Sequence, residues 1–388
     1  MSNIKPHQLG DLIEFQRGYD LPKSKFVNGP YPVQSSNGIL GYHNEYKVKG
    51  PGITIGRSGT VGLPHLLESD FYPHNTALFV KDFKGNDIRY VFYLLKYLKL
   101  GDMKSGSGVP TMNRNHLHPL MIQATTDIKE QQGIASILSA IDKKIELNNR
   151  INTELEAMAK TLYDYWFVQF NFPDANGKPY KTSGGKMVYN PTLKREIPEG
   201  WKAASLLDIA SFKNGIACQK YFPKEDEVGA FKVIKIREFS SGLDKNSDVV
   251  TSNVPEDLII QDGDVLFSWS ATLDVKLWTG GIGALNQHIF KVDSIEYPKS
   301  FYYFKVLGYL EHFKMVAELR KTTMGHITRA HLEDSHVPLP SKDLVEKLDI
   351  SLNPLLDQII AKSKESQKLA ELRDWLLPML MNGQVTVI

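Results

Sequence analysis

The chain carries the same short motif twice, and this repeat limits the possible folds more than any other feature. Residues 11–18 follow the pattern D-x3-F-x2-G, and residues 208–215 follow it again. The sequence RNHL at 114–117 similarly returns as RAHL at 329–332. Self-similarity over this distance indicates a duplicated domain. Two related domains in one chain favour two related binding tasks over one catalytic pocket.

The spacing between matching residues indicates where the two copies differ. The offset is 197 residues at the first motif, 211 where Asn75 is paired with Asn286, and 215 at His116 and His331. Insertions are therefore expected in the first two thirds of each copy, where loops of different specificity on a shared scaffold would lie. Drift of duplicated loops is the alternative explanation.

Each copy begins with short strand-like segments punctuated by glycine, such as 52–56 and 264–269. An aromatic helix is predicted over 88–98 in the first copy and over 300–313 in the second. Each copy is therefore predicted to be an α+β domain.

Both copies end in a heptad pattern typical of a long helix, in which apolar residues recur in alternating steps of four and three. Both seams turn polar at equivalent places, Asn148 and Asn152 in the first and Lys362 and Ser366 in the second. These polar residues either fix the register of a helix pair or belong to an exposed, frayed segment. The first seam comprises Ile134, Leu138, Ile141, Ile145, Asn148, Asn152, Leu155, Ala159, Leu162 and Trp166, and the second Leu348, Leu352, Leu355, Ile359, Lys362, Ser366, Leu369, Arg373, Leu376 and Leu380.

The simplest way to bury two such seams is to pack the helices against each other. An antiparallel pair with approximate two-fold symmetry would carry one domain at each end. A helix of 35–40 residues is about 55 Å long at roughly 1.5 Å per residue. Pro354 lies inside the second pattern and is best tolerated in a first helical turn, so that helix is expected to begin near Leu352.

Composition excludes several classes of protein. The net charge of +2 is nearly neutral, so any nucleic-acid contact must come from local patches of Lys and Arg. Cys218 is the only cysteine, which excludes an intramolecular disulfide framework and a cysteine-rich zinc site. The first ten residues are polar, and no stretch approaches the roughly 20 apolar residues that span a bilayer. We therefore expect a soluble, cytoplasmic protein without membrane contact.

The centre of the chain has the most specific motifs. The first heptad helix ends in YWFVQF at 165–170, and a connector rich in Pro, Gly and Lys follows at 171–200, including GKPYKTSGGKMV at 177–188. IPEGW at 197–201 opens the second domain, and LLPMLMNG at 376–383 closes the second helix. Together these segments resemble the specificity subunits of type I restriction–modification systems, and the resemblance covers essentially the whole chain. The first helix opens with EQQ at 130–132, which also resembles the family. The second helix departs from the family because it lacks a similar opening.

The resemblance implies a non-catalytic subunit with two target-recognition domains joined by two antiparallel helices. Each domain would recognise one half of a bipartite, asymmetric double-stranded DNA target, and the helices would set the spacer. The helices would also dock two methyltransferase subunits, which use S-adenosylmethionine at adenine N6, and two restriction/motor subunits that use ATP and Mg can join. No cofactor or metal is expected in this chain. The implied parts are recognition domain 1 (1–125), a central helix (126–170), a connector (171–200), recognition domain 2 (201–340) and a distal helix (341–388).

The residues themselves do not encode catalysis. A methyltransferase would need an Asn/Asp-Pro-Pro-aromatic loop to hold the flipped base, but no Pro-Pro dipeptide occurs. GRSGTVG at 56–62 lacks the phosphate-loop Lys, and no third metal ligand stands at a useful spacing from His116 and His118. The alternatives are a fused or degenerate methyltransferase or nuclease, which would show activity alone, and a two-headed protein-interaction scaffold, which would not bind DNA sequence-dependently.

Base recognition requires side chains that donate and accept hydrogen bonds, and phosphate contacts require basic and hydroxyl groups. Such residues lie in glycine-rich segments of both domains, although a solvated loop is the alternative for any one of them. In the first domain the DNA-binding candidates are Arg17, Tyr19, Lys23, Lys25, Ser35, Ser36, Asn37, Arg57, Ser58, Lys104, Ser105, Ser107, Thr111 and Arg114. In the second they are Lys213, Asn214, Gln219, Lys220, Tyr221, Lys235, Arg237, Ser268, Trp269, Ser270, Lys321, Thr322, Thr323, His326 and Arg329.

Aromatic residues gather near the ends of the two heptad helices. Tyr165, Trp166, Phe167 and Trp375 are candidates for docking the methyltransferase subunits, and packing in the core is the alternative for each.

Overall fold

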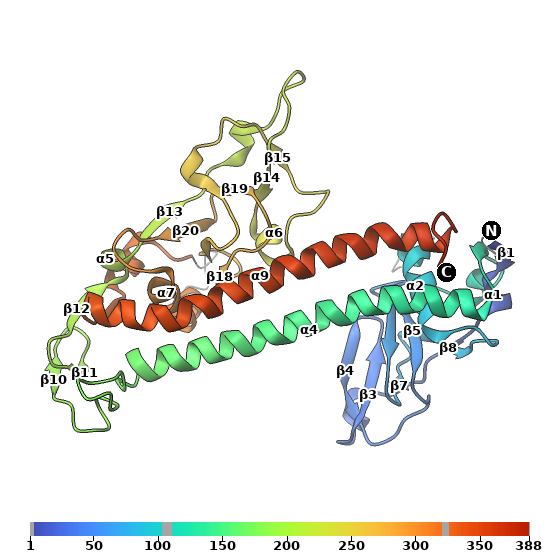
Figure 1. Cartoon of the computed structure of the whole chain (residues 1–388). Coiled ribbons are helices and arrows are strands. Elements are labelled where there is room, and N and C mark those ends of the chain that lie inside the picture. The colour runs from blue at the N-terminus through green and yellow to red at the C-terminus, as the bar shows by residue number, and fades with distance from the viewer. Residues whose placement is uncertain (1–3, 103–110, 320–325, 388) are drawn as a thin grey trace. The chain divides into compact units, whose positions relative to one another are not determined.

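The chain folds into two compact units. Unit 1 comprises Met1–Ile145 and Lys368–Ile388, and unit 2 comprises Glu146–Gln367. Two long helices, α4 (Ile128–Phe167) and α9 (Lys342–Met381), each contribute residues to both units (Figure 1). The structure is a computed structural model that describes residues 4–102, 111–319 and 326–387.

Unit 1 is built on a four-stranded antiparallel sheet with the strand order β2-β8-β5-β6. A second sheet has the order β4-β3-β7, in which β3 and β7 run parallel, and a short pair β1-β9 joins the two ends of the unit's sequence. The strands are β1 (Lys5–Gln8), β2 (Glu14–Arg17), β3 (Tyr31–Ser35), β4 (Gly38–His43), β5 (Gly52–Gly56), β6 (Pro64–Leu67), β7 (Tyr72–Pro73), β8 (Ala77–Asp82) and β9 (Met121–Ala124). The helices are α1 (Leu9–Leu12), α2 (Ile88–Leu98) and α3 (Arg114–Leu117).

Unit 2 repeats this plan. Its antiparallel sheet has the order β13-β20-β17-β18, and the pair β12-β21 corresponds to β1-β9. The second sheet, β15-β14-β19-β16, again contains one parallel pair, β14 with β19. The strands are β12 (Lys202–Ser205), β13 (Ser211–Asn214), β14 (Phe231–Ile234), β15 (Val249–Val250), β16 (Ile259–Ile260), β17 (Val265–Ser268), β18 (Asp274–Leu277), β19 (Gly283–Leu285), β20 (Ile289–Asp293) and β21 (His336–Leu339). The helices are α5 (Leu206–Ile209), α6 (Ile236–Ser241), α7 (Lys299–Leu319) and α8 (Arg329–Asp334).

The repeated D-x3-F-x2-G motif forms the same structure in both units. Its aspartate closes a single helical turn, because Asp11 Oδ2 accepts from the backbone N–H of Gln8 at 3.3 Å and Asp208 Oδ2 accepts from that of Ser205 at 2.7 Å. A carboxylate at this place satisfies an N–H that the helix cannot. The motif phenylalanine is then the second residue of the strand that enters the main sheet, and Phe15 is fully buried.

The aromatic helices were predicted correctly in type and place. The predicted helix over 88–98 is α2, which begins after Asp87, whose side chain accepts from Tyr90 N at 2.9 Å. The helix predicted over 300–313 is α7, which continues to Leu319. The predicted α+β class, with two repeated domains and two long helices, is thus confirmed.

The long helices pack antiparallel within each unit. In unit 1 the first turns of α4, including Ile134 and Leu138, share a core with Leu380 near the end of α9. In unit 2 the later part of α4, including Leu155, packs with Leu348 near the start of α9. Most predicted seam residues are buried, which confirms the heptad assignment.

The polar part of the seam joins the two helices within unit 2. Asn148 Nδ2 donates to Glu365 at 3.1 Å, and Asn152 Nδ2 donates to Ser363 Oγ at 2.9 Å. Asn148 is fully buried and Ser366 is 9% exposed. The segment is therefore a packed polar contact between the helices. The alternative, an exposed and frayed segment, is wrong.

The expected start of the second helix was wrong. The helix α9 begins at Lys342, so Pro354 lies about three turns inside it. An interior proline removes one backbone hydrogen bond and costs about 3 kcal/mol. Leu348, Leu352 and Leu356, on both sides of the proline, are at most 1% exposed, and burying three leucines outweighs this cost. Leu356 replaces Leu355 as the buried seam residue.

The connector is an ordered segment. Within 171–200, β10 (Met187–Asn190) and β11 (Arg195–Pro198) form an antiparallel hairpin. Phe172 stacks on both Tyr180 and Trp201, with ring centroids 4.6 and 5.4 Å apart. Gly177 and Gly184 adopt positive φ in the bends and turns of this connector.

Candidate nucleic-acid interface

The loops at one end of each main sheet are held by the same backbone hydrogen bonds. In unit 1, Gly18 N donates to Ala77 O at 3.0 Å, and in unit 2 Gly215 N donates to Ile289 O at 3.0 Å. Arg57 N donates to Thr76 O at 2.8 Å. In unit 2 the equivalent residues lie 212 places later. There Trp269 N donates to His288 O at 3.3 Å.

Glycine is required where these loops cross. A Cβ atom on Gly18 would lie 2.1 Å from His74 O, and one on Gly215 would lie 2.2 Å from Asn286 O. No side chain fits at such a distance, so the last residue of the repeated motif is fixed by a close backbone approach. The crossing also pairs His74 with Asn286. The pairing of Asn75 with Asn286 was therefore wrong by one residue.

The candidate residues of unit 1 come from four separate segments that meet in one loop cluster. Met112 N donates to Arg57 O at 2.8 Å, and Ser58 and Thr111 form an isolated β-bridge. Thr60 Oγ1 donates to Asn37 Oδ1 at 3.1 Å. These contacts bring the segments together, although Asn37 and Met112 are 75 residues apart in the sequence.

Charged and amide groups of this cluster are linked. Arg17 Nη2 lies 3.0 Å from Asp20 Oδ1, and Asn75 Nδ2 donates to the same carboxylate. Arg57 Nη1 donates to Asn75 O at 3.4 Å. Burial lowers the pKa of the neighbouring His74, which favours its neutral form near pH 7. The cluster thus presents arginine and amide donors without a histidine charge.

The remaining candidates of unit 1 differ in exposure. Lys23, Lys25 and Arg114 are exposed, as phosphate contacts require. Tyr19 is half-buried and packs against Tyr72 and Phe79, so its ring is part of the fold. Ser35 and Ser36 are 4% and 6% exposed, and Ser35 Oγ donates to Gly38 O at 2.8 Å. Their side chains stabilise the loop and do not reach its surface.

In unit 2 an aromatic group occupies the corresponding place. Trp269 Nε1 donates to Asn214 Oδ1 at 3.0 Å, and its ring lies 5.6 Å from His288 and 6.0 Å from His326. Lys213 Nζ lies 3.3 Å from Asp293. The equivalent residues of unit 1 are Arg57, Thr76 and Thr111, so unit 2 has a tryptophan and two histidines where unit 1 has an arginine and two threonines.

Further candidates of unit 2 lie on the second sheet or inside the fold. Lys235 pairs with Asp248, and Arg237 lies 3.5 Å from Asp244. Ser268 and Ser270 are only 0% and 8% exposed, so their side chains are not available to DNA. They were chosen for their hydroxyl groups, and the residue type does not show whether a side chain is buried. Gln219, Lys220 and Tyr221 belong to a short 3-10 helix (Cys218–Tyr221), and Arg329 opens α8.

Some candidates lie outside the described residues. These are Lys104, Ser105, Ser107, Lys321, Thr322 and Thr323.

The four docking candidates also differ. Trp375 is 56% exposed and Tyr165 is 37% exposed. Phe167 is 1% exposed and lies edge-on to Trp201 and Phe301, and Trp166 is partly buried against the same core. The ring of Phe167 therefore faces the core of unit 2.

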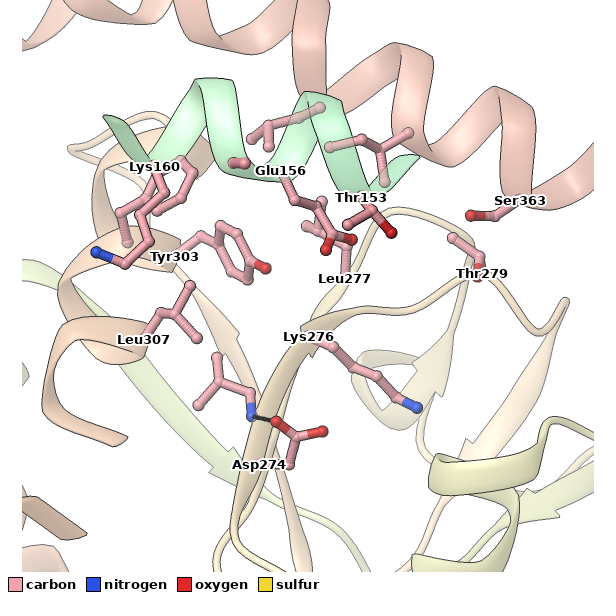
Figure 2. A pocket seen from close by; sticks show the side chains of 15 residues that line it. Thr153, Glu156, Lys160, Asp274, Lys276, Leu277, Thr279, Tyr303, Leu307 and Ser363 are labelled. Atoms are coloured by element: carbon pink, nitrogen blue, oxygen red, sulfur yellow. Dashed lines mark hydrogen bonds between the residues drawn. The ribbon is translucent and has the colours of Figure 1, made fainter. Parts of the chain in front are cut away.

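A cavity of about 540 Å³ lies in unit 2 between α4, β18, α7 and α9. Figure 2 shows Glu156 and Tyr303 pointing into it from opposite helices. The Lys276 ammonium at its rim lies 4.2 Å from the centre of the Phe239 ring, and burial lowers the pKa of this lysine. The lining contains no histidine or cysteine and none of the loop candidates. Nothing in this cavity indicates catalysis.

Two further properties hold for the described part of the chain. Within it, no group of three or more His, Cys, Asp or Glu side chains is placed to hold a metal ion. Every helix in the same ranges is too short or too polar to cross a bilayer.

Sequence reasoning missed two residues of the loop clusters. Neither Asn75 nor Gln287 was among the DNA-binding candidates chosen from the sequence. Both lie at the tip of the turn that crosses the motif glycine. The motif glycine is the signal that could have identified them. It shows that another segment of backbone passes close to it, and that segment contains the turn.

Comparison with known proteins places this architecture in a family. The family model described as "Type I restriction modification DNA specificity domain" matches residues 1–157 and 198–371. The type I restriction enzyme MjaIX specificity subunit of Methanocaldococcus jannaschii is 26% identical over 315 residues, covering 77% of this chain and 69% of that protein. The HindI specificity subunit of Haemophilus influenzae is 23% identical over 319 residues, covering 67% and 68%.

A solved structure has the same fold. The crystal structure of a type I restriction–modification system S subunit from M. genitalium matches with a TM-score of 0.63 and 16% identity, covering 98% of this chain and 96% of that chain. Because the family model spans most of the sequence and matches both copies, this chain belongs to the type I restriction–modification DNA specificity family.

Proposed function

We propose that the chain recognises a bipartite, asymmetric double-stranded DNA target, with recognition domain 1 (1–125) contacting one half and recognition domain 2 (201–340) the other. As a specificity subunit, the chain is the non-catalytic component of its complex. One observation carries the proposal. The two units share a loop framework fixed by equivalent backbone hydrogen bonds, and they place different side chains on it, such as Arg57 and Trp269. One framework with two chemistries fits two different half-sites.

The proposed contacts divide by type. Exposed lysines and arginines such as Lys23, Lys25 and Arg329 would contact phosphates, which give affinity but no sequence preference. Arg17 and Arg57 in unit 1 and Asn214 in unit 2 would contact base edges. A net charge of only +2 implies weak binding by the chain alone. Affinity would then rise when partner subunits close around the duplex.

The long helices would dock two adenine-N6 methyltransferase subunits and set the length of the unrecognised spacer. Exposed apolar side chains on them support this proposal: Met158 and Tyr165 on α4 are 58% and 37% exposed, and Leu372 and Trp375 on α9 are 43% and 56% exposed. The methyltransferase partner would supply S-adenosylmethionine, and two restriction/motor subunits would supply ATP and Mg chemistry. We assign no cofactor to this chain, and we place the complex in the cytoplasm.

Co-expression of the chain with its methyltransferase, followed by long-read sequencing of host DNA, tests the proposal. The expected result is a gapped, asymmetric motif methylated at adenine on both strands. A contiguous or palindromic motif would contradict the assignment of one domain to each half. A stable complex that methylates no specific motif would contradict DNA recognition itself.

A further inference from the structure

Asn75 and Gln287 occupy the same position in the two units. Each follows the residue that crosses the motif glycine and is the second residue of a four-residue turn. In unit 1 the turn is closed by Ala77 N donating to His74 O at 2.9 Å. In unit 2 the bond runs between the residues 212 places later, from Ile289 N to Asn286 O at 3.2 Å. A side chain in this position projects from the tip of the turn into the loop cluster.

The two amides are alike in clusters where several equivalent positions differ. Two other equivalent pairs are also alike, Ser58 with Ser270 and Arg114 with Arg329. Most other equivalent positions of the clusters carry different chemistry in the two units. An arginine of unit 1 corresponds to a tryptophan of unit 2, and a threonine of unit 1 corresponds to a histidine of unit 2. At the turn tip both units have a primary amide, and the two side chains differ only by one methylene. The divergent pairs are Arg17 and Asn214, Tyr19 and Ile216, Arg57 and Trp269, Thr76 and His288, and Thr111 and His326.

A primary amide has one strong preference among base pairs. Its oxygen accepts from adenine N6 and its nitrogen donates to adenine N7, a pairing that either Asn or Gln can make in the major groove. Building on the proposed function, we propose that Asn75 and Gln287 each recognise an adenine, one in each half of the target. The two half-sites then share this base while their other recognised bases differ.

Neighbouring groups orient the Asn75 amide. Its Nδ2 donates one hydrogen to Asp20, which is also bound by Arg17 at 3.0 Å. The amide nitrogen carries a second hydrogen for adenine N7. Gln287 Nε2 lies 3.4 Å from His288 Nε2, so this longer side chain also has a neighbour at the turn. Both side chains are partly exposed.

Selection from a random duplex library tests the inference. The full chain, assembled with its methyltransferase subunits, is mixed with random-sequence DNA, and bound duplexes are sequenced. In Asn75→Ala, one adenine of one half-site should become degenerate, with preference falling roughly 5- to 150-fold. Gln287→Ala should do the same in the other half-site. Asn75→Gln keeps the amide and should keep the adenine preference.

The controls separate base recognition from folding and from the proposed function. Asn44→Ala removes an exposed amide outside the loop cluster and should leave the motif unchanged. If Asn75→Ala loses every position of its half-site, the domain has misfolded, and the polar, turn-compatible Asn75→Ser decides instead. Adenine preference that survives both truncations, or degeneracy at a base other than adenine, overturns the inference. A wild-type complex that selects no motif at all overturns the proposed function.

Discussion

Lys305 of α7 is a buried cation, and replacing it by methionine should change how the stability of unit 2 depends on pH. The residue is 6% exposed. Its ammonium lies 5.1 to 5.7 Å from the ring centres of Phe301, Tyr163 and Phe167 and donates to Pro338 O at 3.0 Å. Burial, together with a smaller effect of the Arg195 charge, lowers its pKa from 10.5 to about 7.

The sign of the effect follows from proton linkage. Because the folded-state pKa is about 7 and the unfolded-state value is near 10.5, the unfolded chain holds one more proton between these pH values. The free energy of unfolding therefore rises with pH in this window, by roughly 1.4 kcal/mol per unit. Since the group is already half-titrated at pH 7, the increase from pH 7 to pH 9 is about 2 kcal/mol.

The substitution Lys305→Met keeps a similar volume and removes the titration. The variant should gain stability relative to the wild type at pH 7, and this advantage should shrink by about 2 kcal/mol on going to pH 9. Urea unfolding at pH 7, 8 and 9 measures it. Tryptophan fluorescence is a suitable signal, because Trp166 and Trp201 lie beside Phe167 with ring centroids 6.4 and 5.7 Å away.

Lys314→Met is the matched control on the same helix. Lys314 pairs with Glu311 on the surface at 2.8 Å, so its removal should leave the pH dependence as in the wild type. The reasoning is refuted if the stability difference between Lys305→Met and the wild type stays constant within about 0.5 kcal/mol from pH 7 to pH 9. The lysine would then remain charged inside the aromatic group, held by its ring and carbonyl contacts.

Three further changes have defined outcomes. Gly215→Ala should lower the unfolding free energy by about 1–3 kcal/mol, because its Cβ would meet a backbone oxygen. Gly308→Ala, in open space on α7, should raise the unfolding free energy by up to about 1 kcal/mol. Thermal unfolding of the two variants compares these effects. Asp142→Asn should cost about 1–2 kcal/mol in urea unfolding, since Asp142 accepts from Tyr93 and Arg373, each at 2.8 Å, and unchanged stability would show that these bonds contribute nothing. Inserting four residues between the two seam asparagines of α4 lengthens the helix by about 6 Å and should change the spacer in the methylated motif; an unchanged spacer, with helix content intact by circular dichroism, would reject the role of helix length.

Local signals in the sequence were sufficient for the elements that depend on local chemistry. The helix over 88–98 was predicted to the residue from its aromatic and apolar residues, and the structure adds a local reason for its start, the Asp87 cap. The heptad seams were also found, because their period survives the polar interruption at Asn148 and Asn152. Pro354 misled the prediction for the opposite reason: its cost is local, but the leucine burial that offsets it comes from contacts with other elements.

The candidate site was harder to predict, because exposure and neighbours depend on the whole fold. Ser268 and Ser270 have the composition of a contact loop, yet the sheet edge buries them. Their neighbour Trp269 is placed between histidines that come from two distant segments. Residue type alone selected all three. The repeat does contain information about which turn belongs to the loop cluster. When the two copies are aligned at their motif glycines, the turn that crosses each glycine can be identified.

The backbone therefore fixes the loops and leaves their side chains free to change. Equivalent N–H groups and carbonyls hold the crossing at Gly18 and at Gly215, and no side chain takes part in these bonds. Replacing Arg57 by Trp269 between the copies consequently changed the chemistry of the cluster without altering the hydrogen bonds that shape it. A framework of this kind lets each domain acquire a new specificity by substitution at a few loop positions, while a side chain at either glycine would collide with the backbone that crosses it.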